Sequence, residues 1–358
     1  MAEEKDFLDH FPALSNEAKD YIRDKVKEIS EFQHGIHMVE LKILELYWEG
    51  LKNLADAAKA VQDYLSRRDP LILDLDGDGI ETHSINNGTY FDHNANGFTE
   101  RTAWVSSDDG LLVLDRNGDG TINNGREVFG DQTILKNGQR AANGFQALAD
   151  LDGNKDGIID ANDVAYSQLR VWQDINGNGV SEGGELKTLA EHGIESLNVT
   201  SAISNITDSQ GNTQTRTGSY EKMDGTTATI ANVNFQHDMM NSIPSNLLNV
   251  PEDIAALPDL AGYGNLYDLH QAMARDTANQ LKSLVEQFVA STDISERNSL
   301  MEQILFKWAG SDTIDPVSRG GNIDARQLAV VEKYMGENYV GAAGSNPNST
   351  AAILLNNC

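Results

Sequence analysis

The sequence predicts an α+β protein with a helical N-terminal arm, a central module of Asp/Asn/Gly-rich loops that includes a β-hairpin region, and a C-terminal helical domain. Three observations lead to this prediction. Apolar residues recur at helical intervals near both ends of the chain, glycine, Asn and Asp are dense in the middle, and alternating strand-like segments follow Ile194.

Changes in composition divide the 358 residues into five segments. The boundaries are marked by Pro70 and by three prolines between Ile243 and Pro258. We expect a helical segment (1–68), a central module (69–240), a linker (241–258), a helical domain (259–341) and a flexible tail (342–358).

The N-terminal arm carries apolar residues from Ile22 to Leu54 at mostly three- and four-residue spacing, with Lys and Glu between them. This pattern is typical of one long helix or of a helical hairpin hinged near Gly35. Ordinary helix packing and a partner-binding coiled coil both fit it. Helical spacing returns in LYDLHQAMA, NQLKSLVEQFVA, RNSLMEQILFKWA and DARQLAVVEKYM.

The charge balance excludes some partners. The chain has 55 Asp and Glu residues against 27 Lys and Arg, a formal net charge of -28. Nucleic acid and anionic membrane surfaces require a basic face, so neither is expected. No apolar run approaches the roughly 18 residues of a membrane span. The carboxylates either form a solvated surface or serve as ligands for divalent cations.

Two segments carry oxygen-bearing residues at the spacing of a calcium-binding loop. Ca²⁺ takes six to eight oxygens, and a twelve-residue loop supplies them from positions 1, 3, 5, 7, 9 and 12, with glycine at position 6. The Asp152 loop (152–163) offers Asp152, Asn154, Asp156, the Ile158 carbonyl, Asp160 and Asp163. The Asp174 loop (174–185) offers Asp174, Asn176, Asn178, the Val180 carbonyl, Glu182 and Glu185.

A helix is expected from Asn162 to Gln173, between these two loops, and an apolar helical face (Phe145, Leu148, Leu151) precedes the first. Helix, loop, helix, loop and helix in succession predict paired EF-hand-like or dockerin-like loops. Two loops in tandem make calcium the expected cofactor. Mg²⁺ fits less well because the loops offer many ligands and little room for retained waters.

Three further loops match the calcium template in part. The Asp74 loop (74–85) has Asp74, Asp76 and Asp78 but Ile85 at position 12, and the Asp92 loop (92–103) has Asp92, Asn94 and Asn96 but Ala103 there. The Asp115 loop (115–127) has Asp115, Asn117, Asp119 and Thr121, with Arg126 at position 12 and Glu127 one residue later. Each is either a metal loop completed from elsewhere in the fold or an Asx-turn without an ion.

The Asp69-Pro70 bond lies between the helical arm and the first loop. A proline nitrogen carries no N–H, is more basic than an ordinary amide nitrogen and leaves more readily. The Asp69 carboxylate can attack its own carbonyl to close a cyclic anhydride, which is intramolecular nucleophilic catalysis. A second such dipeptide, Asp315-Pro316, shows that the dipeptide alone proves little, and the residues by themselves favour a turn or linker.

The long segments DPLILDLDGDGIET, WVSSDDGLLVLDRNGDGTINNGREVFGD and NGFQALADLDGNKDGIIDANDVAYSQLRVWQDINGNGVSEGGELKTL resemble the self-processing module of FrpC-like RTX exoproteins. The resemblance runs from Asp69 to about Asn234, and segments after Leu257 resemble the adjoining helical region of such proteins. It implies that calcium orders the module, that Asp69 and Pro70 flank a bond the module cleaves, and that the new terminal Asp can couple to a lysine of another chain.

The resemblance also implies a secreted protein exported by the type I route, which agrees with the N-terminal MAEEKDFLDHF lacking the features of a Sec signal peptide. No nonapeptide array of the RTX type is present in the sequence. The leading expectation is therefore a calcium-triggered autoprocessing protein. The alternative is a non-catalytic, calcium-stabilised structural or adhesion module of a large exoprotein.

Overall fold

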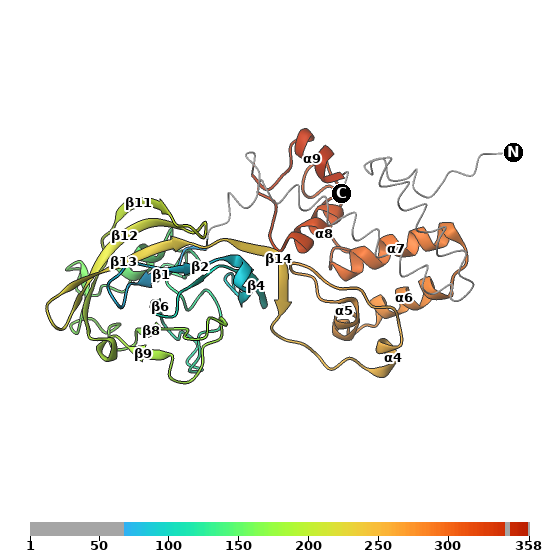
Figure 1. Cartoon of the computed structure of the whole chain (residues 1–358). Coiled ribbons are helices and arrows are strands. Elements are labelled where there is room, and N and C mark those ends of the chain that lie inside the picture. The colour runs from blue at the N-terminus through green and yellow to red at the C-terminus, as the bar shows by residue number, and fades with distance from the viewer. Residues whose placement is uncertain (1–67, 341–343, 357–358) are drawn as a thin grey trace. The chain divides into compact units, whose positions relative to one another are not determined.

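The computed structural model describes residues 68–340 and 344–356, so the predicted N-terminal helical arm lies outside the described residues. The chain divides into two compact units, one of residues 66–245 and one that includes residues 246–358 (Figure 1). The first unit is called the β unit here and the described part of the second is called the helical unit.

A nine-stranded antiparallel sheet forms the centre of the β unit (Figure 1). Eight strands run in the order β7-β10-β12-β13-β1-β6-β8-β9, and β11 pairs with β12. These strands are β1 (Leu71–Leu73), β6 (Gly110–Val113), β7 (Ile158–Ile159), β8 (Arg170–Trp172), β9 (Leu186–Thr188), β10 (Ile194–Asn198), β11 (Ala202–Thr207), β12 (Thr213–Lys222) and β13 (Thr227–Asn234).

Two small antiparallel sheets, one α-helix and two 3-10 helices, η2 (Ile85–Asn87) and η3 (Ala190–His192), complete the β unit as described. The first sheet has the order β14-β4-β3, and the second pairs β2 with β5. Their bounds are β2 (Thr82–His83), β3 (Thr89–Phe91), β4 (Phe98–Thr102), β5 (Trp104–Val105) and β14 (His237–Pro244), and the helix is α3 (Gly144–Ala149).

Strand β1 is buried on both faces, which explains why its sequence is an unbroken apolar run. Leu71 and Leu73 pack into a cluster that contains Phe145 of α3. Ile72 points to the other face, into a cluster that contains Trp172. Burying such side chains stabilises the fold by roughly 1.5–3 kcal/mol each. The residues flanking β1 are therefore held firmly at both ends of the strand.

The predicted α+β class with paired EF-hand-like loops is wrong for the β unit, which is mostly β. The expected helix from Asn162 to Gln173 is a series of turns followed by strand β8. Val171 and Trp172 are fully buried in the sheet, where they pair with Leu112 and Leu111 of β6. Tertiary pairing thus overrides local helical spacing. Of the five acidic loops, the Asp152 loop follows helix α3, and the other four follow strands.

The helical unit contains the four segments with helical spacing. Its helices are α4 (Glu252–Ala255), α5 (Leu269–Arg275), α6 (Gln280–Ala290), α7 (Ile294–Trp308), α8 (Ala325–Met335) and α9 (Ser349–Asn356). Asp293 and Asp324 cap α7 and α8 by accepting backbone N–H bonds in the first turn. Among the described residues, no helix has the length and apolar character needed to cross a membrane.

Candidate functional site

Five acidic loops of the β unit share one backbone turn. In each, the residues at positions 4 and 6 have positive φ, as glycine permits at little cost. These pairs are Gly77 and Gly79, Ala95 and Gly97, Gly118 and Gly120, Lys155 and Gly157, and Gly177 and Gly179. The turn is common to the two loops that match the calcium template throughout and to the three that match it in part.

The turn wraps backbone donors around the first aspartate of the loop. In the Asp152 loop, Lys155 N–H donates to Asp152 Oδ1 at 2.7 Å and Gly157 N–H donates to Oδ2 at 3.0 Å. The Asp115 and Asp174 loops repeat both bonds with their own residues at positions 4 and 6. The first carboxylate is thereby fixed, and the oxygens of the following side chains gather on one side of it.

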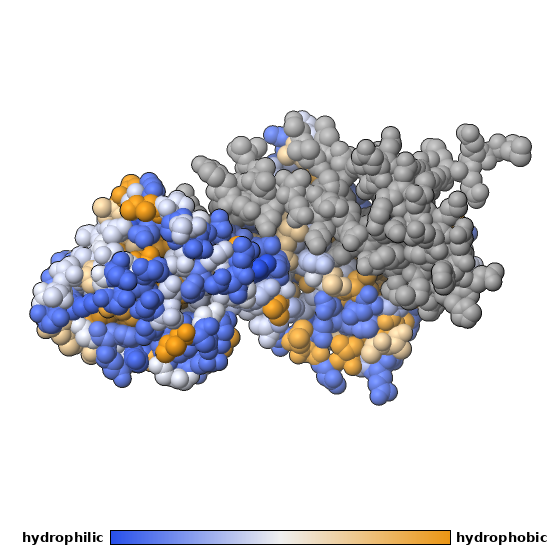
Figure 2. All heavy atoms as spheres, in the orientation of Figure 1, coloured by the Kyte–Doolittle hydropathy of each residue, from blue (hydrophilic) through white to orange (hydrophobic). Residues whose placement is uncertain are grey.

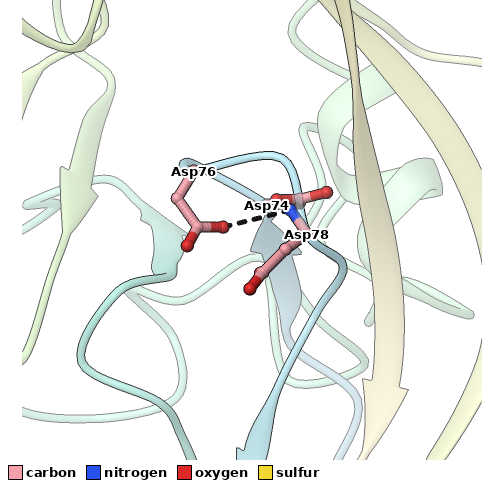
Figure 3. Close-up of side chains that lie close together, drawn as sticks. All are labelled: Asp74, Asp76 and Asp78. Atoms are coloured by element: carbon pink, nitrogen blue, oxygen red, sulfur yellow. Dashed lines mark hydrogen bonds between the residues drawn. The ribbon is translucent and has the colours of Figure 1, made fainter.

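Carboxylate oxygens converge in the Asp74 and Asp152 loops. Asp74, Asp76 and Asp78 each offer one oxygen within 4.8 Å of the others, and Asp152, Asp156 and Asp163 do the same. Figure 3 shows the three side chains of the Asp74 loop gathered at the turn that follows β1. Like charges repel at such distances, so a hard divalent cation suits these oxygens.

A buried carboxylate closes three of the loops from within their own sequence. One of its oxygens accepts the N–H of loop position 2, and the other accepts the N–H of position 9. The closing residues with these donors are Asp163 (Gly153, 2.8 Å; Asp160, 3.3 Å), Glu185 (Ile175, 3.2 Å; Glu182, 3.1 Å) and Glu127 (Arg116, 3.3 Å; Asn123, 3.0 Å). Glu127, and not Arg126, therefore occupies the closing place of the Asp115 loop.

Glu100 takes the same place in the Asp92 loop. Its Oε2 accepts the N–H of His93, the residue at position 2, at 3.0 Å. Its side chain is 0% exposed, and burial raises its pKa to about 8. Neither Glu100 Oε1 nor Asn94 Oδ1 has a hydrogen-bond partner among the described residues. Buried polar atoms are rarely left without partners, so these two oxygens fit a bound cation.

Asp109 closes the Asp74 loop from another part of the chain. Its Oδ1 accepts the N–H of Leu75, the residue at position 2, at 3.2 Å, and its Oδ2 accepts the N–H of Glu81 at 2.9 Å. Asp109 is 0% exposed, and burial raises its pKa to about 8. It directly precedes β6, which pairs with β1. Local spacing could not reveal this residue because the sheet brings it to the loop.

The structure does not bring every predicted ligand to its loop. Both oxygens of Asp160 accept bonds from Asn162, and Asp160 is not in the converging group of its loop. Glu182 does reach the centre of its own loop, where its oxygens accept from the amides of Asn176 and Asn178.

Two core tryptophans tie the Asp174 loop to the sheet. Trp104 Nε1 donates to Asp174 Oδ2 at 2.7 Å, and Trp172 Nε1 donates to Glu185 Oε2 at 3.2 Å. The two indole rings pack edge to face with their centroids 5.5 Å apart. The first and last carboxylates of this loop are therefore anchored in the apolar core.

The Asp69-Pro70 bond is buried at the N-terminal end of β1. Asp69 is 4% exposed, and its Oδ1 accepts the backbone N–H of Asp131 at 2.7 Å. The carbonyl oxygen of Asp69 accepts a hydrogen bond from the Asn232 side-chain amide. The Pro70 carbonyl accepts the N–H of Val233 at 3.0 Å. Hydrogen bonds from strand β13 and from the loop that contains Asp131 thus hold the bond on two sides.

The carboxyl groups beside this bond, those of Asp69 and Asp131, both have raised pKa values. Burial, and after it the negative charge of Asp131, raise the pKa of Asp69. Burial also raises the pKa of Asp131, against the opposing charge of Arg68. The two neighbouring carboxyl groups therefore hold a proton that exposed aspartates would release. Two carboxyl groups with raised pKa values therefore lie beside the Asp69-Pro70 bond.

The geometry links the Asp69-Pro70 bond to the first loop, because only the three residues of β1, about 10 Å of strand, separate Pro70 from Asp74.

Comparison with known proteins agrees with the division of the chain into a β unit and a helical unit. Residues 71–236 match the SPM domain, so the region that bears the loops is similar to that class of domain and begins beside Asp69-Pro70.

Over 249 residues, 68% of the chain, the sequence is 44% identical to the Iron-regulated protein FrpA of Neisseria meningitidis serogroup C. The aligned part spans 22% of that protein. The expected similarity to an Frp protein is thus confirmed over the aligned part of the chain.

Proposed function

We propose that the β unit binds calcium and, once ordered by it, cleaves the Asp69-Pro70 bond of its own chain. The observation that carries this proposal is the placement of the bond. The bond is buried, and Asp69 accepts a hydrogen bond at its carboxyl group and another at its carbonyl oxygen. A three-residue strand joins the bond to an acidic loop.

Calcium is the cation that these loops fit. Their donors are carboxylate and amide oxygens in a flexible arrangement, as Ca²⁺ prefers. The chain has a formal net charge of -28, and Figure 2 shows hydrophilic residues over much of the visible β unit. A site of ~10 µM affinity at roughly millimolar calcium adds about 2.7 kcal/mol to the free energy of unfolding. At submicromolar calcium this gain is nearly absent, so the β unit would fold stably outside the cell, where calcium is millimolar, and not in the cytosol.

The chemistry of cleavage needs the chain's own groups and one water molecule. The Asp69 carboxylate attacks its own carbonyl carbon and closes a five-membered anhydride as the bond to the Pro70 nitrogen breaks. The nitrogen takes up a proton, and water opens the anhydride. Because the nucleophile and the carbonyl belong to one residue, their proximity lowers the activation barrier by several kcal/mol.

The same anhydride is electrophilic toward a lysine amine. Attack by a lysine of another chain joins Asp69 to that chain through an isopeptide bond. The resemblance to self-processing modules supports this second fate of the anhydride. We also propose that the protein is secreted by the type I route, where extracellular calcium would trigger folding and cleavage together.

A calcium-addition experiment tests the proposal. The full chain is purified in chelator, brought to about 1 mM Ca²⁺, and analysed by denaturing gel and mass spectrometry. We expect fragments 1–69 and 70–358 from the wild type and an intact chain from Asp69→Asn. Asp315→Asn is the matched control, because Asp315 precedes the other Asp-Pro proline and is exposed. An intact wild-type chain that still folds with calcium would instead support a structural module.

A further inference from the structure

We propose that the side-chain amide of Asn232 is the oxyanion donor for cleavage of the Asp69-Pro70 bond. This inference rests on the proposed self-cleavage and deepens it by naming the group that stabilises the tetrahedral intermediate. Asn232 lies 163 residues from Asp69 in the sequence, on β13, and its Nδ2 donates to the carbonyl oxygen of Asp69. That oxygen is the atom that gains negative charge during attack.

The orientation of the amide is fixed by its second partner. The backbone N–H of Gly144 donates to Asn232 Oδ1 at 2.8 Å. A backbone N–H can only donate and a carbonyl can only accept, so Nδ2 must face Asp69 and Oδ1 must face Gly144. The amide is thereby preorganised before any charge develops.

The surrounding fold holds Asn232 in place. Its backbone pairs with Leu71 of β1 on one side and with Arg216 of β12 on the other. Asn232 is 0% exposed, so water does not compete for its amide. There is no room for a side chain at Gly144, where an added Cβ would lie 2.6 Å from Leu71 Cγ and 2.7 Å from the Phe129 carbonyl oxygen. These constraints keep the donor at the scissile carbonyl.

In the proposed step, a carboxylate oxygen of Asp69 forms a bond to the carbonyl carbon and the carbonyl electron pair moves onto oxygen. The Asn232 N–H bond to that oxygen shortens and strengthens as the charge grows. The pair then returns to re-form the carbonyl, the bond from carbon to the Pro70 nitrogen breaks, and that nitrogen takes the proton held by Asp131. The products are the cyclic anhydride, the amine of Pro70 and the Asp131 carboxylate.

The size of the effect follows from other oxyanion donors. Removing one such donor slows catalysis by about 10²–10³-fold. The Asn232 donor acts in a buried site, where it is not weakened by solvent. We therefore expect the Asn232→Leu chain to cleave about 10²–10³-fold more slowly than the wild type.

The test uses the full chain and three variants with calcium added to initiate a single turnover. Asn232→Leu removes the donor, and Asn232→Asp keeps an acceptor for Gly144 but donates only when protonated. Asn198→Leu is the matched control, because Asn198 lies on β10 of the same sheet and its amide bonds to Ser219 Oγ. First-order rate constants are followed from about pH 6 to 9, beside circular dichroism with calcium.

The expected result is a slow Asn232→Leu chain, a control near the wild-type rate and calcium-dependent folding in all of them. The wild-type rate should rise with pH as Asp69 ionises while Asp131 keeps the proton that the two carboxyl groups share, whereas Asn232→Asp should slow as its new carboxyl ionises. A purely structural role for Asn232 would not reverse the pH profile.

Two results would overturn the inference, and they are distinguishable. If the wild type cleaves and both Asn232 variants cleave at its rate with its pH profile, Asn232 is not the donor and self-cleavage stands. If the wild type folds with calcium and stays intact, the proposed function fails and the donor role fails with it. Should Asn232→Leu not fold, the Asn232→Asp profile decides alone.

Discussion

The Asp174 and Asp74 loops share a backbone turn but differ in how they are closed. The Asp174 loop receives its closing carboxylate from Glu185, within the same twelve residues. The Asp74 loop receives its own from Asp109, at the start of a different strand. A loop that is closed locally can assemble as soon as its own segment turns. A loop that is closed remotely exists only when β1 and β6 are already paired.

This difference assigns the two kinds of loop to different tasks. Locally closed loops stabilise their own segments of the β unit. A cation bound in the remotely closed loop would be coupled to the pairing of β1, the strand that begins two residues after Asp69. The Asp74 loop is therefore the element through which calcium would act most directly on the cleavage site.

Removing the closing carboxylate of each loop should have the largest effect. Each lost ligand charge weakens calcium binding. Asp109→Asn should slow calcium-triggered cleavage at least about tenfold more than Glu185→Gln, because Asp109, unlike Glu185, closes the loop that follows β1. Rate constants over a calcium titration would measure this. Equal losses in the two variants would show that the place of closure does not matter.

The protonation of two buried carboxyl groups leads to a second, smaller effect. Burial raises the pKa of Asp109 and of Glu100 to about 8, well above the pKa of either residue in an unfolded chain. These groups therefore stabilise the calcium-free fold at low pH, and that stability is lost as the pH rises through about 8.

Calcium binding near pH 7 should consequently release protons, because a ligand carboxylate must be ionised. Calorimetry in two buffers of different ionisation enthalpy would detect the release, and Asp109→Asn with Glu100→Gln should diminish it. Proton release that is unchanged in the double variant would contradict the assignment of these two residues as ligands.

The smallest expected effect separates two glycines at position 6. Gly157→Ala places a side chain at φ +92° in open space, which costs about 1–2 kcal/mol through the left-handed backbone alone. Gly179→Ala adds a contact of 2.5 Å between the new Cβ and the Tyr90 carbonyl oxygen, so it should lower the free energy of unfolding further. Urea denaturation at saturating calcium compares the two, and equal losses would argue against docking of the Asp174 loop on β3.

The sequence predicts those parts of the site that lie within one loop. Asp152, the glycine at position 6 and the closing residues Asp163 and Glu185 are all placed by a twelve-residue spacing, because the turn itself imposes that spacing. Asp109 and Asn232 escape such reasoning. Their roles depend on strand pairing between segments that are distant in the chain.

The fold was harder to predict for a related reason. Strands of two to four residues, such as β1 and β8, are too short to show the alternation that identifies a strand. The helix expected from Asn162 to Gln173 failed because Trp172 gains more from burial in the sheet than from local helical spacing. Short buried strands between polar loops thus conceal a large sheet.

The two indoles that hold the Asp174 loop have an optical consequence. Trp104 and Trp172 each donate to a carboxylate that a cation would draw away or polarise, and their rings pack edge to face against each other. Their emission should therefore shift when that one loop fills, without any added dye. The chain would carry its own fluorescent reporter, by which occupancy of the Asp174 loop could be timed against the appearance of the cut ends.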